Sequence, residues 1–196
     1  MLILASASPR RQELLRSAGI PFVVQPTEIP EIARPGEHPQ TCAERLAREK
    51  ALAISREQPT DLVLGADTIV VVDGEMLGKP LDVADAARML RLLSGRSHQV
   101  ITGVCLIGPT LGTENRELRT FQDIRSETTT VFMDALSDTQ IQSYIATGEP
   151  MDKAGAYAIQ GIASRWIPRI AGDYPNVVGL PVALVWRMLC EHQAHL

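Results

Sequence analysis

The 196-residue sequence lacks the features that mark secreted, membrane-spanning and zinc-finger proteins. Its three cysteines lie far apart and form no CxxC pair, so neither a disulfide framework nor a zinc or redox motif is indicated. No stretch approaches the roughly 20 apolar residues of a membrane span. The apolar run Leu2–Ala5 is too short for a signal peptide and has no basic residue before it. These absences predict a cytoplasmic protein with reduced thiols and no membrane partner.

A surplus of positive charge is also missing. The 23 acidic residues outnumber the 19 lysines and arginines, which gives a formal net charge of −4. Because binding to a nucleic-acid polymer requires excess basic side chains on one face, this balance argues against nucleic acid as a partner. The four histidines show no metal-ligand spacing. An anionic ligand would therefore need a local cluster of basic residues.

What is present is a globular composition, with 45% apolar and 21% charged residues. The length suits a single domain, or two closely packed lobes, and we predict one domain over residues 1–196. Strand and helix patterns alternate through the first half of the chain. This alternation predicts an α/β fold with a largely buried sheet.

The boundaries of the expected elements follow from periodicity, capping residues and turn residues. The expected strands are Leu2–Ala5, Phe22–Val24, an interrupted run within Asp61–Asp73, His98–Ile107 and Ser126–Met133, with a strand-like segment over Lys153–Pro181. The expected helices run from Ser8 to Gly19, from a capping box at Thr41–Glu44, over Asp82–Leu93, from a capping box at Ser137–Gln140, and over Val182–Cys190. Loops are expected at Pro26–Pro39 and Pro109–Asn115.

The first candidate site is the turn from Ser6 to Arg11, which joins a strand end to a helix N-terminus. Unpaired backbone N–H groups and the helix dipole favour an anion at such a place. Ser8, Arg10 and Arg11 would hold a phosphate there. A capped helix with solvated arginines accounts for the same pattern equally well.

The second candidate is Asp67, which stands with Thr68 inside an otherwise apolar strand. A buried carboxylate is costly unless it is paired, so Asp67 needs a partner, a metal or water. Ligand-binding crevices in α/β folds also usually lie at the ends of strands. Lys50 falls on the apolar stripe of a helix, so it either extends to solvent, the commoner outcome, or meets a carboxylate or phosphate.

Two further residues, Lys79 and Gln160, could bind a ligand or could have a purely structural role. Lys79 stands between Gly78 and Pro80, in a turn that leaves its ammonium group able to reach an anion. An ordinary surface lysine is the alternative. Gln160 lies in a glycine-rich segment, where its amide could read a nucleotide base or could satisfy nearby backbone.

Taken together, these motifs resemble the Maf family of nucleotide pyrophosphatases over nearly the whole chain. The motifs that carry the resemblance are Leu4–Leu15 (LASASPRRQELL), Arg45–Ala51 (RLAREKA), Gly65–Thr68 (GADT), Gly78–Pro80 (GKP), Leu93–Gly95 (LSG), Val100–Gly103 (VITG), Glu149–Tyr157 (EPMDKAGAY) and Asn176–Pro181 (NVVGLP). The resemblance implies a two-lobed α/β fold with an elongated mixed β-sheet flanked by helices, similar to inosine triphosphate pyrophosphatases. It also implies an active site in the inter-lobe cleft.

The resemblance further implies hydrolysis of a nucleoside triphosphate between its α- and β-phosphates with Mg²⁺ or Mn²⁺. By this likeness Asp67 is the proton acceptor, and Glu31 joins it on the metal side. Lys50 and Lys79 serve catalysis by holding the triphosphate. The same likeness implies that Ser8 and Arg10 are substrate-binding residues that contact the phosphates.

Base preference follows from the same resemblance. Arg11, Thr68 and Gln160 match the specificity positions of the branch that acts on dTTP and UTP. Three alternatives stay open, namely the 7-methyl-GTP branch, a non-catalytic nucleotide-binding regulator of cell division, and a metal-independent phosphate-binding module. A homodimer is plausible for this family.

Overall fold

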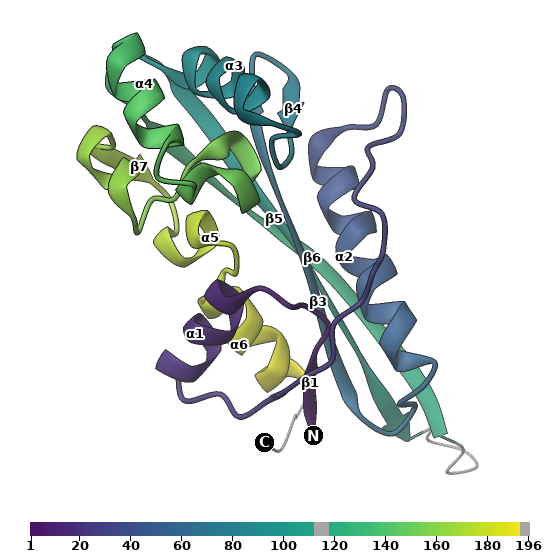
Figure 1. Cartoon of the computed structure of the whole chain (residues 1–196). Coiled ribbons are helices and arrows are strands. Elements are labelled where there is room, and N and C mark those ends of the chain that lie inside the picture. Colours follow the sequence, from purple (N-terminus) through teal and green to yellow (C-terminus); the bar gives the residue numbers. More distant parts are fainter. Residues whose placement is uncertain (112–117, 193–196) are drawn as a thin grey trace. The chain divides into compact units, whose positions relative to one another are not determined.

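The computed structural model describes residues 1–111 and 118–192 (Figure 1). In chain order its elements are β1 (Leu2–Leu4), α1 (Pro9–Ser17), β2 (Val23–Val24), α2 (Pro39–Ser55), β3 (Leu62–Val72), β4 (Glu75–Leu77), α3 (Val83–Leu93), β5 (Ser97–Leu111), β6 (Leu118–Phe132), α4 (Asp138–Ile145), the 3₁₀ turns η1 (Glu149–Asp152), η2 (Ala154–Ala156) and η3 (Ile162–Trp166), β7 (Arg169–Ala171), α5 (Tyr174–Val178) and α6 (Val182–Glu191). Among the described residues, no helix is both long and apolar enough to traverse a bilayer.

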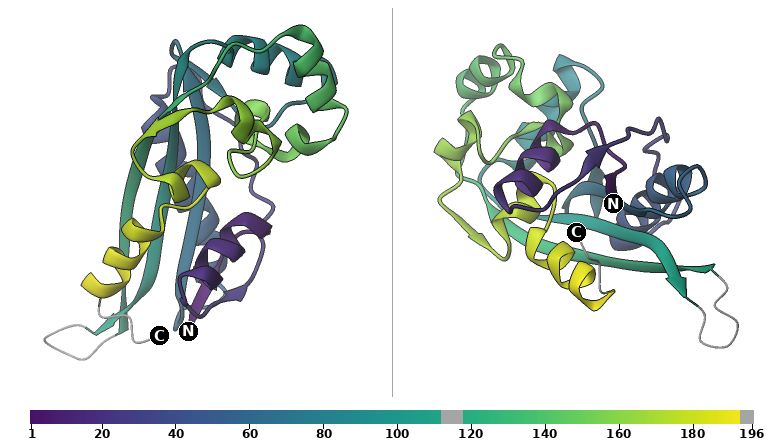
Figure 2. Two further views of the ribbon diagram at one scale, coloured as in Figure 1. Left: turned by 90° about the vertical axis from the view of Figure 1, so that its left-hand side faces the viewer. Right: turned by 90° about the horizontal axis from the view of Figure 1, so that it is seen from below.

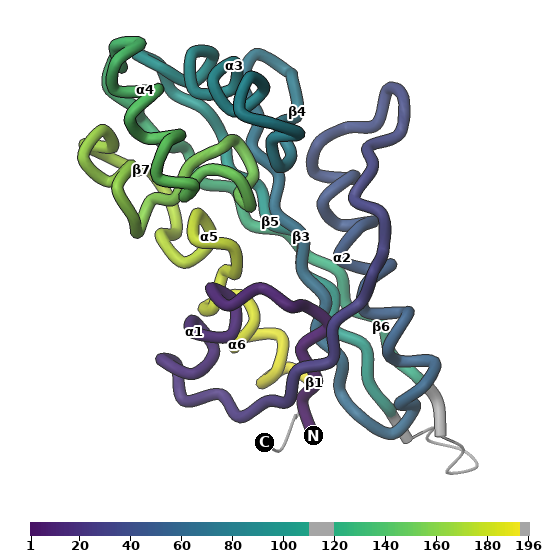
Figure 3. The backbone as a smooth tube through the Cα atoms, viewed as in Figure 1, coloured from purple at the N-terminus to yellow at the C-terminus, as the bar shows by residue number. Residues whose placement is uncertain are grey.

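The chain folds into two compact units. The first comprises Met1–Asp67, Thr102–Glu127 and the chain from Gly179 onward, and the second comprises Thr68–Ile101 and Thr128–Val178. The backbone can be followed in Figure 3. It passes from the first unit to the second along β3, back to the first along β5, and to the second again along β6. Three strands therefore contribute residues to both units.

The sheet is mixed, as expected for the predicted fold class. The strand order is β2-β1-β3-β5-β6-β7, and β4 pairs with β3. The strand β1 lies parallel to β2 and β3, whereas β4 is antiparallel to β3 and β7 is antiparallel to β6. The strands β5 and β6 are neighbours of 15 residues each (Figure 2). The α/β prediction is confirmed.

In the first unit β1, β3 and β5 are buried on both faces, whereas both residues of β2 are exposed. Successive strand residues point to opposite sides, so Leu2 and Leu4 face one layer while Ile3 faces the other. The leucines pack with Leu15 of α1 and with α6, in one hydrophobic cluster. Ile3 packs with Ala47 and other residues of α2, in a second cluster. This arrangement explains why β1, β3 and β5 read as continuous apolar runs.

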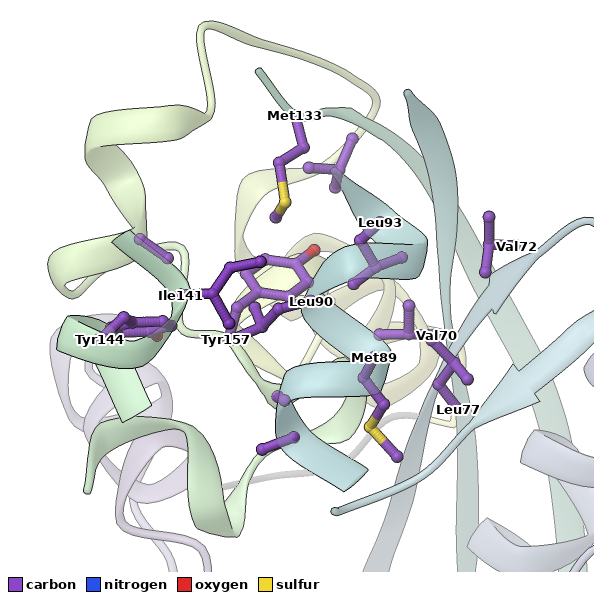
Figure 4. Packing of buried hydrophobic residues seen from close by; sticks show 14 of the residues in the cluster. Val70, Val72, Leu77, Met89, Leu90, Leu93, Met133, Ile141, Tyr144 and Tyr157 are labelled. Atoms are coloured by element: carbon purple, nitrogen blue, oxygen red, sulfur yellow. The ribbon is translucent and has the colours of Figure 1, made fainter. Parts of the chain in front are cut away.

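The second unit has its own core, formed where α3 and α4 pack with the strands and 3₁₀ turns. Figure 4 shows side chains of this cluster, with labels on Val70, Val72, Leu77, Met89, Leu90, Leu93, Met133, Ile141, Tyr144 and Tyr157. The helix α3 begins at its N-cap Asp82, as predicted, and α4 begins with the predicted capping box of Ser137 and Gln140. Apolar periodicity therefore located α3 correctly, and a capping signal located α4.

Several sequence predictions about elements are wrong. The strand β6 begins at Leu118, before the predicted start at Ser126. The helix α2 begins at Pro39, before the predicted capping box at Thr41, because proline suits the first turn of a helix. The strand β5 extends to Leu111 into the predicted loop 109–115, whose residues 112–115 lie outside the described chain. Much of Lys153–Pro181 forms 3₁₀ turns and α5 instead of strands, with β7 as the strand there. Gly155, at φ 69, takes a left-handed conformation that no strand allows.

Candidate active site

The turn between β1 and α1 is built from hydroxyl groups and a buried arginine. The Ser8 side chain caps α1 by accepting a hydrogen bond from the backbone N–H of Arg11, with an N···O distance of 3.4 Å. Arg11 is only 9% exposed, and its guanidinium donates from Nε to the Gly179 carbonyl at 2.8 Å and from Nη1 to Ser6 Oγ at 3.1 Å. The interpretation of Arg11 as a solvated arginine is therefore wrong, whereas Arg10 and Ser8 are half-buried.

Lys50 and Asp67 form a buried ion pair in the first unit. Each residue is 5% exposed, and Lys50 Nζ lies 2.6 Å from Asp67 Oδ1. The same Nζ lies 2.6 Å from Glu31 Oε1, so one ammonium group is shared by two carboxylates. The expectation that a buried Asp67 needs a partner is confirmed. The alternative in which Lys50 extends to solvent is wrong, because both carboxylates hold it inside.

The electrostatic balance at Asp67 is dominated by burial. Burial raises the pKa of Asp67 above its ordinary value, and the positive charges of Lys50 and Arg11 oppose this shift. Burial likewise lowers the pKa of Arg11, against the negative charges of Asp67 and Glu31. The Ser8 turn and the Asp67 pair therefore belong to one electrostatic environment, in which a carboxylate can serve as a base.

Gly65 brings α2 close enough to β3 for this pair to form. A Cβ atom at Gly65 would clash with the carbonyl oxygen of Ala47 and would lie 2.8 Å from the backbone nitrogen of Ala51. The helix backbone therefore rests directly on the strand two residues before Asp67. Gly103 of β5 plays the same part, because its Cβ would clash with the backbone of Ala43. Two glycines in the family motifs thus set the helix–sheet distance.

An arginine whose role sequence reasoning missed ties down the loop that carries Glu31. The Arg45 guanidinium meets Glu37 twice, from Nε to Oε1 at 2.6 Å and from Nη2 to Oε2 at 2.7 Å. It also donates to the Ile32 carbonyl at 3.0 Å and contacts Glu49 at 3.2 Å. The signal was an i,i+4 pair of Arg45 and Glu49 on the helix that also presents Lys50. Arg45 therefore connects α2 to the segment beside Glu31.

The Arg45–Glu37 pair is expected to make stability depend on acid pH. Arg45 holds the pKa of Glu37 at about 2, below its ordinary value of 4.5. The ionised form is thus favoured by folding, so the stabilisation is complete above about pH 4.5 and is lost as pH falls toward 2. We expect Glu37→Gln to lower the free energy of unfolding by about 1 to 2 kcal/mol at pH 7, and by less at pH 3. Urea unfolding at both pH values measures this difference.

The control for that experiment is Glu13→Gln. The Glu13 side chain is 71% exposed and pairs with Arg16 across 3.6 Å on the surface of α1. Such exposed pairs contribute little, so this variant should resemble the wild type at both pH values. An equal loss of stability at pH 7 and pH 3 for Glu37→Gln would refute the assignment to an ion pair.

The second unit holds the remaining predicted residues. Thr68 is half-buried in β3, and Lys79 and Gln160 are exposed. The turn carrying Lys79 is anchored because the Gly155 N–H donates to the Gly78 carbonyl at 3.0 Å. This contact joins two of the family motifs. The structure thus brings Lys50, Asp67, Glu31 and the Arg11 turn together in one unit, and a common site with Lys79, Thr68 and Gln160 stays a prediction.

The residues present fit a divalent cation whose remaining ligands would come from phosphate oxygens. Mg²⁺ is commonly bound through one or two carboxylates together with phosphate oxygens. Glu31 and Asp67 supply two carboxylates, both within 2.6 Å of one Lys50 Nζ. Within residues 1–111 and 118–192, no three His, Cys, Asp or Glu side chains gather as a protein-only metal site would require.

Comparison of folds finds a solved structure of similar architecture. The structure of the Staphylococcus aureus Ham1 protein superimposes with a TM-score of 0.51 and 14% sequence identity. The match covers 97% of this chain and 98% of that one. At this level of identity the likeness concerns the fold alone, and it agrees with the α/β class predicted from the sequence.

Comparison of sequences finds nearly full-length relatives. The dTTP/UTP pyrophosphatase of Koribacter versatilis is 57% identical over 188 residues, covering 96% of this chain and 92% of the relative. The protein of the same name from Symbiobacterium thermophilum is 56% identical over 190 residues, covering 97% and 93%. The family described as Maf-like protein matches residues 1–192. This chain therefore belongs to the Maf family.

Proposed function

We propose that this protein hydrolyses dTTP and UTP to the nucleoside monophosphate and pyrophosphate. Two relatives that are 57% and 56% identical over nearly the whole chain bear the name dTTP/UTP pyrophosphatase, which supports this substrate class. The observation that carries the chemistry is the buried Asp67 carboxylate, 2.6 Å from the ammonium group of Lys50. A buried ion pair of this kind costs desolvation, which function can justify.

In the proposed reaction, a water oxygen forms a bond to the α-phosphorus. The bond from that phosphorus to the oxygen bridging the α- and β-phosphates breaks, and its electron pair leaves with pyrophosphate. Asp67 accepts a proton from the attacking water. Because burial raises the pKa of Asp67, its carboxylate is a stronger base than that of an exposed aspartate.

Positive charge supplies the other half of the mechanism. The triphosphate gains stability from nearby cations, and the transition state gains more where those cations are already oriented. Arg11 is held by Ser6 and the Gly179 carbonyl, and Lys50 is held by two carboxylates, so neither group must reorganise. We assign Ser8 and Arg10 to the phosphates at the N-terminus of α1. Lys79 keeps its predicted role as a phosphate ligand.

The proposed cofactor is Mg²⁺ or Mn²⁺, held by Glu31, Asp67 and phosphate oxygens. When bound, such a cation lowers the pKa of coordinated water and offsets phosphate charge. We expect activity to disappear in excess chelator and to return on addition of either metal. A pyrophosphate-release assay with and without chelator measures this. Full activity in chelator would favour the metal-independent phosphate-binding module instead.

A substrate panel tests the function itself. Pyrophosphate release from dTTP, UTP, CTP, GTP and 7-methyl-GTP is measured with the purified protein. We expect the highest kcat/KM values for dTTP and UTP. A preference for 7-methyl-GTP would favour the second branch of the family, and binding without any release would favour a non-catalytic regulator of cell division.

The cellular setting is also part of the proposal. We propose a cytoplasmic location, consistent with three free cysteines of which Cys42 and Cys105 are buried. A homodimer stays a prediction from the family resemblance, and light scattering on the purified protein tests it. The absence of a nucleic-acid partner stays a prediction from the net charge.

A further inference from the structure

The segment that carries Gln160 is anchored on both sides by one pair of side chains. On one side, the Ala158 N–H donates to Tyr144 Oη at 3.1 Å. On the other side, the Ile162 N–H donates to Glu149 Oε1 at 3.0 Å. Tyr144 Oη in turn donates to Glu149 Oε1 at 2.8 Å. A single hydrogen-bonded unit thus holds the backbone before and after Gln160.

The anchoring pair is itself rigidly held. Tyr144 is 1% exposed, lies in the core of the second unit (Figure 4), and packs edge-on against Trp166 with ring centroids 5.5 Å apart. Burial and the bond to Glu149 raise the pKa of Tyr144, so its hydroxyl stays protonated and able to donate. The backbone carbonyl of Glu149 also accepts a bond from Lys153 Nζ at 2.6 Å. The two anchor points therefore have little freedom to move.

Gly161 shows how closely the segment follows the anchor. A Cβ atom at Gly161 would clash with the Glu149 carboxylate. A larger residue at position 161 would push the Glu149 carboxylate away from the bonds it makes to Tyr144 and Ile162, immediately next to Gln160. Gln160 itself is exposed, although both of its flanks are tied to the core. This combination of a free side chain on a fixed backbone is what a recognition residue needs.

We infer that Tyr144 and Glu149 are positioning residues that set base preference by fixing the backbone from which Gln160 reads the pyrimidine edge. A glutamine amide both donates and accepts hydrogen bonds. Uracil and thymine present N3–H as a donor beside O4 as an acceptor, whereas cytosine presents the reverse order, N3 as an acceptor beside N4–H₂. The amide can turn about its own side-chain bond to present either order, so discrimination depends on the place and angle at which the amide meets the base edge. A fixed backbone sets that place and angle, and a loose backbone does not. The inference rests on the proposed function.

The test compares Tyr144→Phe with Tyr157→Phe. Each variant removes one buried hydroxyl from the same hydrophobic core. Tyr157 is the control because its Oη is hydrogen-bonded to His98 Nε2 at 2.7 Å and not to the backbone on either side of Gln160. We expect Tyr144→Phe to lower the ratio of kcat/KM for dTTP to that for CTP roughly five- to tenfold. The change should appear in KM, with kcat for dTTP kept within about twofold. Tyr157→Phe should leave the ratio unchanged.

A double mutant separates positioning from general loosening. In a Gln160→Ala background the ratio should already be low, and adding Tyr144→Phe should then lower it no further. Amide hydrogen exchange should speed up at Ala158 and Ile162 in Tyr144→Phe but not in Tyr157→Phe. If Tyr144→Phe does not fold, Glu149→Gln takes its place. Glutamine keeps the shape of the Glu149 side chain, and it weakens the bonds accepted from Tyr144 Oη and from the Ile162 N–H.

The outcomes distinguish this inference from the proposed function. If the wild type releases pyrophosphate from no nucleotide, the proposed function fails. If the wild type is active and the dTTP-to-CTP ratio survives in Tyr144→Phe, or falls equally in Tyr157→Phe, the positioning role is overturned while the proposed function stands.

Discussion

Asp67→Asn is expected to reduce kcat for dTTP hydrolysis by a factor of about 100 to 10,000, the range attributed to a general base. The amide keeps the shape of the carboxylate and can still accept a hydrogen bond from Lys50, but it cannot take a proton from water. Lys50 retains Glu31 as an anionic partner 2.6 Å away, so the fold should survive. Steady-state pyrophosphate release measures the loss, and thermal unfolding checks the fold.

Nucleotide binding should persist in this variant. Calorimetric titration with an α,β-methylene analogue of dTTP should give an affinity close to that of the wild type at saturating Mg²⁺. The matched control is Asp73→Asn, which changes the same functional group at the exposed hairpin tip between β3 and β4, where asparagine tolerates the φ of 49. The control should be fully active. Near-normal turnover by Asp67→Asn would show that another group accepts the proton.

Gly65→Ala is expected to lower the free energy of unfolding by about 3 kcal/mol, at the upper end of the cost of overpacking. The added methyl group would meet the backbone of Ala47 and Ala51 in α2, and backbone cannot move aside as a flexible side chain does. If the helix shifts away, Lys50 moves away from Asp67, so activity should fall as well. Urea unfolding and pyrophosphate release together measure both effects.

The control for crowding is Gly78→Ala. This position has no positive φ, and a Cβ atom there would meet nothing within 4 Å. Its stability should therefore change by only a few tenths of a kcal/mol, and a small gain is possible because alanine restricts the unfolded chain. Equal losses in the two variants would mean that close approach of α2 to β3 does not explain Gly65.

Local signals predicted the elements that have local causes. The N-cap of α1 at Ser8 and the capping box at Ser137 are confirmed, since each involves hydrogen bonds within one turn of chain. The helix predicted over Asp82–Leu93 is confirmed as well, and its N-cap is Asp82. The hairpin turn at Asp73–Gly74 also has a local cause, since both residues take positive φ between the paired strands β3 and β4. Where a turn depends on distant contacts, as from Lys153 to Pro181, the strand prediction failed.

The candidate site divides along the same line. The polarity of Asp67 within an apolar strand identified it as a residue that needs a partner, but the pattern could not say which. The fold chose Lys50 from the adjacent helix and Glu31 from a loop, 17 and 36 residues away in the chain. The roles of Arg45 and Tyr144 were not recognised, because each acts by holding a backbone segment that only the folded chain brings near.

The sequence by itself determined the alternation of strands and helices and the membership of a family with recurring motifs. It also showed that Asp67, a carboxylate among apolar residues, needs a partner. These properties depend on neighbours within a few positions or on the order of motifs. Only the tertiary structure decided that Arg11 is buried, that one ammonium group joins two carboxylates, and that the flanks of Gln160 share an anchor. Charges and hydrogen bonds act over a few ångströms of space, and folding alone sets which distant residues come within that range.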